Sequence, residues 1–280
     1  MKALLDKAYK NKYAVPAINV SNLETIIGAF EAAFELRAPI ILQIAPIQVN
    51  KQGSTYEELA DIIKVISKRF DVDYAIHGDH MMTIEECQAA VDGGFTSVMF
   101  DGSAQEFSLN CDLSREARNI CNVKGITLEG ELGHVGGTEG EHSDDTTCIY
   151  TDVNLAKEYV EKSGVDCLAI AIGNAHGFYK GKPELNFEIL EEINKILKMP
   201  LVLHGGTGIA NEDIKKSISL GISKINFFTE VDYEFTNTFA KEVSNNSGIY
   251  MIAAGESARN SFKEKVKEKI KVTMSEGRLD

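Results

Sequence analysis

Pro200–Gly208 reads PLVLHGGTG, and this stretch shows the pattern that the rest of the chain repeats. A short run of large apolar residues leads to a histidine and a glycine-rich turn, and Asn211-Glu212-Asp213 then has the residue types of a helix start. A near-continuous apolar run of this length is typical of a strand buried on both faces of a parallel sheet. The sequence therefore predicts repeated strand–helix units.

Seven further runs of this kind alternate with amphipathic segments, one of which begins with Thr83 and Glu86 at the spacing of a capping box. Eight strands that alternate with helices predict the α/β class and a closed (β/α)8 TIM barrel, with a doubly wound sheet as the alternative. The expected strands are Ala14–Val20, Pro39–Ala45, Asp73–His80, Ser97–Asp101, Gly125–Gly133, Cys167–His176, Pro200–Gly206 and Lys224–Glu230.

No low-complexity linker divides the chain, so we expect a single domain over residues 1–280 that ends in a helical segment. The longest irregular stretch is about 134–151, which is rich in Gly, Asp, Glu and Thr. Long loops inside compact domains often cover active sites. We therefore expect a mobile active-site loop there.

The composition is that of an ordinary soluble protein, with 44% hydrophobic and 25% charged residues. The 29 basic and 42 acidic residues give a net charge of −13, which argues against binding to nucleic acid or an anionic membrane but allows small phosphorylated ligands. No apolar run reaches the length of a membrane span, and no signal peptide is evident. Five cysteines without a CxxC pair predict free thiols and a cytoplasmic protein.

Four of the six histidines fall at the ends of three expected strands. In a parallel barrel these ends converge on one face, and three imidazoles that leave a coordination position open are typical of catalytic zinc. We therefore predict His80, His176 and His204 as the zinc ligands. The place of His77 is left open between the same face and the core, and His134 and His142 are expected to be solvent-exposed.

Carboxylates lie beside these histidines. Asp79 suits either a partner that orients a ligand or a general acid/base, with a solvated strand end as the third interpretation. Glu131 and Glu139 belong to the same face if the 134–151 loop folds over it.

The turn Gly205-Gly206-Thr207-Gly208 precedes a helix and follows a buried strand, a position that suits a phosphate group. No lysine ends the strand that contains LAIAIGNAH, and Lys224 opens its strand, so Schiff-base chemistry is disfavoured. A metal beside a phosphorylated ketone, acting as a Lewis acid, is the better interpretation.

The chain resembles the class II, zinc-dependent ketose-bisphosphate aldolases of the fructose- and tagatose-bisphosphate type. The resemblance rests on AVPAINVSNLETI (14–26), ELGHVGG (131–137), GNAHGFYKGKP (173–183), LVLHGGTGI (201–209) and KINFFTEV (224–231), in that order. It implies a TIM barrel and a lyase of carbohydrate metabolism, in glycolysis for the fructose type. Such an enzyme reversibly cleaves a ketose bisphosphate to dihydroxyacetone phosphate and an aldehyde, glyceraldehyde 3-phosphate in that case.

The resemblance also implies roles for single residues. His80, His176 and His204 match the ligands of one zinc ion per subunit, and Glu131 matches a carboxylate near the metal, at a second or alternative metal position. Asp79 matches the acid/base at the C4 hydroxyl, and Glu139 matches a residue of proton transfer at the dihydroxyacetone-phosphate carbon. A monovalent cation, Na⁺ or K⁺, and a homodimer or homotetramer are also implied. Five positions match residues that hold dihydroxyacetone phosphate: Gly177, Gly205, Thr207, Asn226 and Thr229.

Among the residues that depart from the family pattern, three lie on the aldehyde side. Phe228 differs from both the fructose and the tagatose pattern, Asp232 replaces a basic residue, and Ala45 replaces a serine. An aldehyde other than glyceraldehyde 3-phosphate is therefore a hypothesis, unless Lys180 or Arg259 supplies the positive charge. The alternatives are a tagatose-bisphosphate aldolase, a dihydroxyacetone-phosphate aldolase with an unphosphorylated aldehyde, a metal-dependent barrel hydrolase and a non-catalytic sensor.

Overall fold

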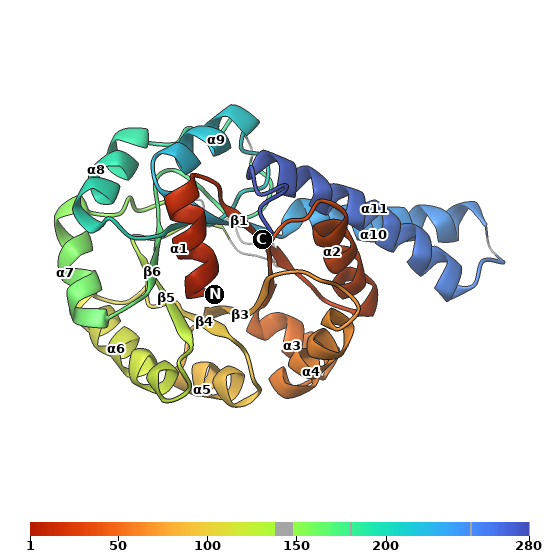
Figure 1. The fold of residues 1–280 in the computed structure, drawn as a ribbon, viewed down its shortest axis with the longest axis horizontal. Helices are drawn as coiled ribbons and strands as arrows, with labels where there is room; N and C mark the ends of the chain where they lie inside the picture. The colour runs from red at the N-terminus through yellow and green to blue at the C-terminus, as the bar shows by residue number, and fades with distance from the viewer. Residues whose placement is uncertain (138–147, 180, 247, 280) are drawn as a thin grey trace.

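The computed structural model describes residues 1–137, 148–179, 181–246 and 248–279. Eight parallel strands pair in sequence order and close into a barrel when β1 pairs with β8, which confirms the predicted (β/α)8 TIM barrel (Figure 1). The strands are β1 (Val15–Asn19), β2 (Ile40–Ile44), β3 (Tyr74–Met81), β4 (Ser97–Phe100), β5 (Thr127–Leu132), β6 (Cys167–Ile170), β7 (Leu201–Leu203) and β8 (Ile222–Phe227).

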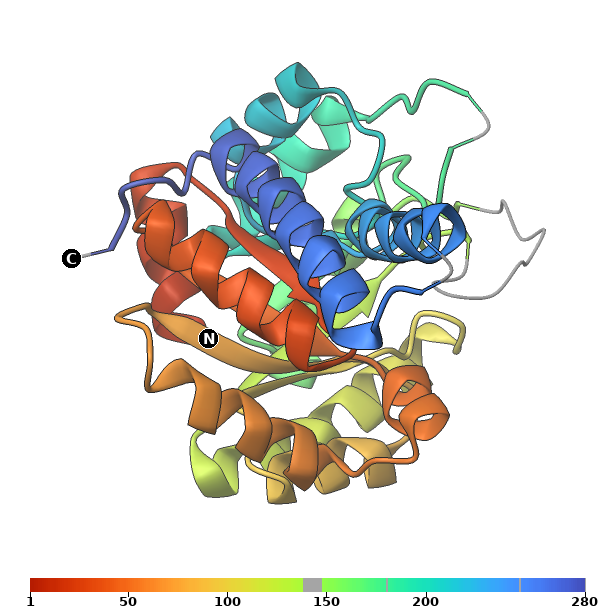
Figure 2. The ribbon, with the colours of Figure 1, turned by 90° about the vertical axis from the view of Figure 1, so that its right-hand side faces the viewer.

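Helices surround this barrel, and the last two leave it as an arm on one side (Figure 1). From the outer end of this arm, α11 runs back and lies beside both α10 and α2 (Figure 2). The helices are α1 (Lys2–Asn11), α2 (Leu23–Glu35), α3 (Pro46–Gln52), α4 (Tyr56–Ser67), α5 (Ile84–Asp92), α6 (Phe107–Lys124), α7 (Val153–Ser163), α8 (Phe187–Leu197), α9 (Asn211–Ser219), α10 (Thr229–Asn245) and α11 (Met251–Val272). The predicted C-terminal helical segment is therefore α10 and α11.

Local sequence explains where several helices begin. In α5 the Thr83 side chain accepts a hydrogen bond from the backbone N–H of Glu86, and the Glu86 carboxylate accepts one from the N–H of Thr83, so the predicted capping box is present. Thr55 and Glu58 do the same at the start of α4. These contacts satisfy N–H groups that the first helical turn leaves without partners.

Three expected strands end clearly earlier than predicted. Residues 171–176 and 204–206 leave the sheet as turns, and α10 already begins at Thr229, inside the expected strand Lys224–Glu230. The reason is local backbone geometry, because Gly173 has a φ of 103° and Gly205 a φ of 63°. His176 and His204 therefore sit on turns that follow β6 and β7.

One end of the barrel is closed by α1. Leu5 and Ala8 of α1, with Tyr13, pack on inward-facing strand residues such as Val15, Ile41 and Val202. A separate and larger cluster fills the space between the strands and the outer helices. The polar strand ends lie at the opposite end, so the apolar plug and the candidate site do not compete for the same positions.

All five cysteines are free thiols, as predicted, and four of them are buried. Within the described residues, none of the helices combines the length and the hydropathy that a membrane span requires.

We predict that Leu5→Ala lowers the free energy of unfolding by about 2–5 kcal/mol, because it leaves a cavity where α1 closes the barrel. Urea unfolding followed by circular dichroism measures this change. The control is Leu109→Ala on α6, where the side chain is 45% exposed and the expected loss is below about 1 kcal/mol. Equal losses for the two variants would contradict the sealing role of α1.

Candidate active site

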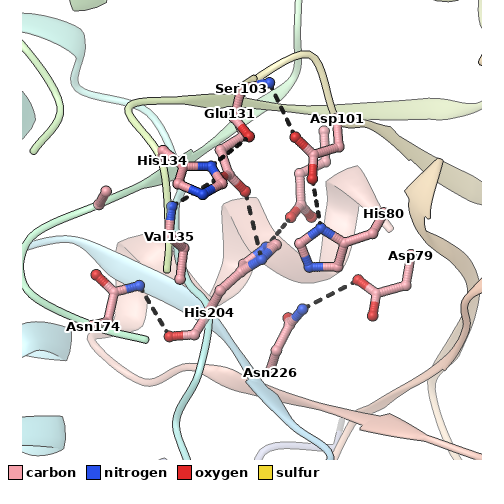
Figure 3. A network of polar contacts seen from close by, with 12 residues as sticks. Asp79, His80, Asp101, Ser103, Glu131, His134, Val135, Asn174, His204 and Asn226 are labelled. Carbon is pink, nitrogen blue, oxygen red and sulfur yellow. Dashed lines mark hydrogen bonds and ion pairs between the residues drawn. The ribbon is translucent and has the colours of Figure 1, made fainter. Parts of the chain in front are cut away.

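The three predicted histidines meet at one end of the barrel. One nitrogen from each of His80, His176 and His204 lies within 4.8 Å of the other two. The rings are arranged with centroids 4.6–5.7 Å apart, and they come from β3 and from the turns after β6 and β7. Figure 3 shows two of them, His80 and His204, with Asp79, Asp101 and Glu131 around them.

A break in the regular geometry of β3 brings two neighbouring residues to this site. Successive side chains of a strand normally point to opposite faces. The pairing of β3 with β4 shifts between Gly78 and Met81, and His80 has a φ of 48°, in the left-handed region that few residues other than glycine adopt. This conformation allows both Asp79 and His80 to contribute side chains to the candidate site. Such local strain is typical of functional sites.

Asp101, at the end of β4, orients His80. Its Oδ2 lies 2.8 Å from Nδ1 of His80, so Nε2 is the nitrogen of that ring that would bind a metal. Burial alone would raise the pKa of Asp101, but the hydrogen bonds from His80 and from the Ser103 backbone outweigh it and hold the pKa well below its usual range. Asp101 is therefore an ionised partner that fixes the imidazole.

The other two imidazoles present nitrogens that fit a metal. Nε2 of His176 and Nδ1 of His204 are buried and have no hydrogen-bond partner among the described residues. Burial, and then the neighbouring His80, lowers the pKa of both rings well below the usual value. Both rings are thus neutral at pH 7, which is the form that coordinates a metal. An orphaned buried donor set of this kind fits the predicted zinc.

Glu131 lies on the other side of the same space. It forms a second group of potential ligands with His80 and Asp101, and its Oε2 is 3.7 Å from Nδ1 of His204. Burial, and then the charge of Asp101, raises the pKa of Glu131 well above its ordinary value. A bound cation would stabilise a carboxylate in this environment. The second or alternative metal position of Glu131 stays a prediction.

Asp79 is fully buried and is held by two amides. Asn19 donates from Nδ2 to one carboxylate oxygen at 3.2 Å, and Asn226 donates to the other at 3.2 Å (Figure 3 shows the second contact). Gln43 in turn donates to the side-chain oxygen of Asn19 at 2.6 Å. The third interpretation of Asp79, a solvated strand end, is therefore wrong, because the strand end lies inside the barrel.

The predicted phosphate-binding turn faces the start of α10. Thr207 is buried, and its Oγ1 accepts from the backbone N–H of Glu230 at 3.4 Å. Thr229 is the first residue of α10, and Phe228 before it provides no side-chain cap. The turn after β7 thus lies next to backbone N–H groups at a helix N-terminus, which suit an anion.

A cavity of about 420 Å³ lies beside the histidines, and its lining includes His80, His176 and Glu131. Asp79, His204 and Thr207 are not part of that lining. Ala45 and Phe228, two of the residues that depart from the family pattern, also line it. The full lining is Asn19, Ala45, Pro46, Ile47, Gln48, His80, Met82, Glu86, Asp101, Ser103, Glu131, His134, Val135, Gly137, His176 and Phe228.

The remaining predicted residues are placed as follows. Glu139, Lys180 and His142 lie outside the described residues. Gly177 has a φ of 84° and directly follows His176. Arg259 lies on α11, where Nε is 3.8 Å from Oε2 of Glu31 on α2, and it does not line the cavity.

His134 differs from our prediction. We expected it to be exposed, but it is only partly exposed and lines the cavity, with Nδ1 3.4 Å from Oγ of Ser103. The backbone causes this, because His134 forms an antiparallel bridge with Ile149 that holds the turn over the strand ends.

Sequence reasoning missed Asn19 and Asp101 at this site. Each stands at or next to the end of an expected strand, which is the signal that identified the histidines. Their contacts to Asp79 and His80 depend on barrel closure and strand register, which a single sequence does not contain.

Comparison with known proteins now adds to this geometry. The sequence profile described as "Fructose-bisphosphate aldolase class-II" matches residues 1–278. The chain belongs to this class II aldolase family.

Its relatives carry more than one name. The chain is 39% identical over 283 residues to a sulfofructosephosphate aldolase of Alkalicoccus urumqiensis. That alignment covers 99% of this chain and 96% of the relative. It is 38% identical over 252 residues to a fructose-bisphosphate aldolase of Geobacillus stearothermophilus, with 89% and 87% covered. The structure of the YdjI aldolase from Escherichia coli K12 superposes with a TM-score of 0.87 at 33% identity, covering 100% of this chain and 98% of that one.

Membership makes the protein a lyase of the aldolase class, a family that acts on phosphorylated sugars and is typically metal-dependent. The barrel hydrolase that we kept as an alternative is therefore disfavoured. The names of the relatives leave the sugar open.

We predict that Glu131→Gln stabilises the metal-free protein, and more so at pH 8 than at pH 5. The pKa of Glu131 is raised on folding, so this carboxyl takes stability away from the wild type as the pH rises above its ordinary value near 4.5, whereas glutamine does not titrate. Thermal unfolding in chelator measures the difference.

The gain in midpoint should grow by at least about 2 °C between the two pH values, the shift that roughly 1 kcal/mol produces in a domain of this size. Glu256→Gln, at an exposed position on α11, is the control and should show no such trend. A gain that is constant or shrinks with pH would contradict the electrostatic account of Glu131.

Proposed function

We propose that the protein is a zinc-dependent aldolase that reversibly cleaves a ketose 1-phosphate or 1,6-bisphosphate to dihydroxyacetone phosphate and an aldehyde. The observation that carries this proposal is the trio of converging imidazoles next to the buried carboxyl of Asp79. Zinc is the metal that three neutral imidazoles with open positions favour. One zinc ion per subunit, a monovalent cation near the phosphate, a homodimer or homotetramer and a cytoplasmic location complete the proposal.

His80, His176 and His204 would hold the metal, with Glu131 at a second or alternative position. When bound there, a divalent metal supplies Lewis-acid polarisation of the substrate carbonyl and stabilises the negative charge that develops beside it. Asp101 serves this function by fixing the ring of His80.

Asp79 would exchange the proton of the C4 hydroxyl as the C3–C4 bond breaks or forms. The amides of Asn19 and Asn226 both donate to it, so its carboxylate is oriented before substrate arrives. Asn19, which contacts Asp79, also lines the cavity, and this supports a position for Asp79 next to the substrate. We keep Glu139 as the candidate for proton transfer at the dihydroxyacetone-phosphate carbon.

The phosphate of dihydroxyacetone phosphate would lie between the turn after β7 and the N-terminus of α10. Gly205 and Thr207 belong to the turn, and Thr229 opens the helix. A side chain at Gly205 would run into the carbonyl oxygen of Ala175, so the backbone comes close to the neighbouring turn only because this residue is glycine. Gly177 and Asn226 complete the proposed contacts, and Lys180 remains a candidate. We do not carry Arg259 forward, because it pairs with Glu31 instead.

With the phosphate near β7 and β8 and the metal in the centre, the aldehyde end of the substrate falls towards β1–β3. The cavity lining there includes Ala45, Ile47 and Met82, and Phe228, between β8 and α10, lines the same cavity. Burial raises the pKa of Asp232, in the first turn of α10. These residues favour an aldehyde without a phosphate over glyceraldehyde 3-phosphate, and the fructose and tagatose bisphosphates remain substrates to test beside it.

We predict release of dihydroxyacetone phosphate that stops in chelator and returns with zinc. A coupled assay compares fructose 1,6-bisphosphate, tagatose 1,6-bisphosphate, fructose 1-phosphate and sulfofructose 1-phosphate. A higher kcat/KM for fructose 1-phosphate would support the unphosphorylated aldehyde, and a higher value for either bisphosphate would overturn that part alone. Release that persists in chelator from metal-free protein would contradict the metal-dependent reaction.

We also predict that Asp79→Ala lowers kcat by about 10²–10⁴-fold while the zinc content stays unchanged, because Asp79 transfers a proton and does not bind the metal. Zinc is measured by mass spectrometry on the same samples. Asp112→Ala, at an exposed site on α6, is the matched control. Parallel loss of zinc and activity would instead make Asp79 a residue that supports the metal site.

A further inference from the structure

A chain of fully buried polar residues lies inside the barrel next to the candidate metal site. His77 of β3, Ser97 of β4, Glu129 of β5 and Lys224 of β8 all have no exposed surface, and the chain ends at His204. None of the first four lines the cavity. Taking charged groups out of water is costly unless each is paired, so such a cluster needs an explanation beyond packing.

The contacts link every member. Lys224 Nζ lies 2.8 Å from Oε2 of Glu129, and Oε1 of Glu129 lies 2.9 Å from Nε2 of His204. Nζ also lies 3.4 Å from Nε2 of His77, and Nδ1 of His77 lies 2.9 Å from Oγ of Ser97. The Ser97 hydroxyl donates to the carbonyl oxygen of Ile76 at 3.3 Å.

The chemistry of these groups fixes the direction of each hydrogen bond. The Ser97 proton goes to Ile76, so Ser97 accepts from Nδ1–H of His77, and Nε2 of His77 accepts from the Lys224 ammonium. A lysine ammonium only donates and a carboxylate only accepts, so Glu129 receives one proton from Lys224 and one from Nε2 of His204. His204 therefore carries its proton on Nε2, and its lone pair is on Nδ1.

Nδ1 is the nitrogen of His204 that has no hydrogen-bond partner within the described residues, and it is the one that faces Glu131 (Figure 3). We propose that Lys224 and Glu129 are positioning residues that lock His204 in the Nε2-protonated form and so present Nδ1 as a metal ligand. This inference rests on the proposed metal site but not on which sugar is cleaved.

The ion pair explains why removing Lys224 alone should be harmful. Without Lys224, Glu129 would be a buried carboxylate that has lost its cation, and the contact to His204 would no longer be held in place. A glutamine at position 129 with a methionine at position 224 removes both charges together. The glutamine oxygen still accepts from Nε2–H of His204, so the double variant should restore much of what Lys224→Met loses.

The first test is nitrogen-15 NMR of metal-free protein with labelled histidine, in which His204→Gln identifies the signals of that ring. The wild type should show His204 protonated at Nε2 alone, and Lys224→Met should show a mixture of the two neutral forms. A wild-type ring protonated at Nδ1 would overturn the proposal. The measurement needs neither metal nor sugar, so it stands apart from the test of aldolase activity.

The second test is zinc affinity by competition with a chromophoric chelator, at a temperature where unfolding scans show every variant to be folded. Lys224→Met should raise the Kd for zinc by about 10- to 100-fold, the range for partners that orient metal ligands. The double variant Glu129→Gln/Lys224→Met should stay within about 10-fold of the wild type.

The control for the loss of a partly buried lysine is Lys267→Met, which breaks the pairs with Glu35 and Glu264 on the outside of the molecule and should leave the Kd unchanged. An unchanged Kd in Lys224→Met would overturn the proposal. So would a double variant that binds zinc no better than the single one, because the two residues would then act through general stability and not through His204.

Discussion

The pairing of β1 with β8 is the interaction on which the site depends. Its register sets Ala17 beside Asn226 and Ile18 beside Phe227, so the end of the first strand lies against the end of the last. Asn19 and Asn226 consequently reach the same carboxyl group from two sides. Without closure these amides would lie at opposite edges of an open sheet, and Asp79 would have neither partner. The arrangement of the side chains at this end of the barrel thus depends on closure of the barrel more than on any one loop.

The repeating pattern of apolar runs and helix starts was sufficient to predict the closed barrel, because it depends on local periodicity and on residue types such as Thr83 and Glu86. The three converging histidines were also predictable, since each stands at or just after the end of such a run. The partners of these histidines were not. Asp101 reaches His80 from a neighbouring strand, and Glu129 reaches His204 across the barrel, at distances that only the register of the sheet determines.

Strand ends are where sequence patterns describe the backbone least well. The predicted strand Lys224–Glu230 runs past the true end of β8 because Phe228 and Thr229 are residue types that favour strands. The left-handed backbone of His80 is likewise invisible in a pattern of apolar and polar residues. Both deviations occur at the functional end of the barrel, where the requirements of a site override regular geometry.

The two ends of the barrel have different roles. The apolar cluster around Leu5 and Tyr13 stabilises the fold, whereas the wall near Ala45 and Phe228 lines the cavity at the opposite end. Mutations at that wall are therefore largely uncoupled from folding and can accumulate without threatening the scaffold. One barrel can in this way diversify among sugars during evolution while its metal-binding centre is retained. The names of its relatives, which refer to different sugars, are consistent with such a separation of the two ends.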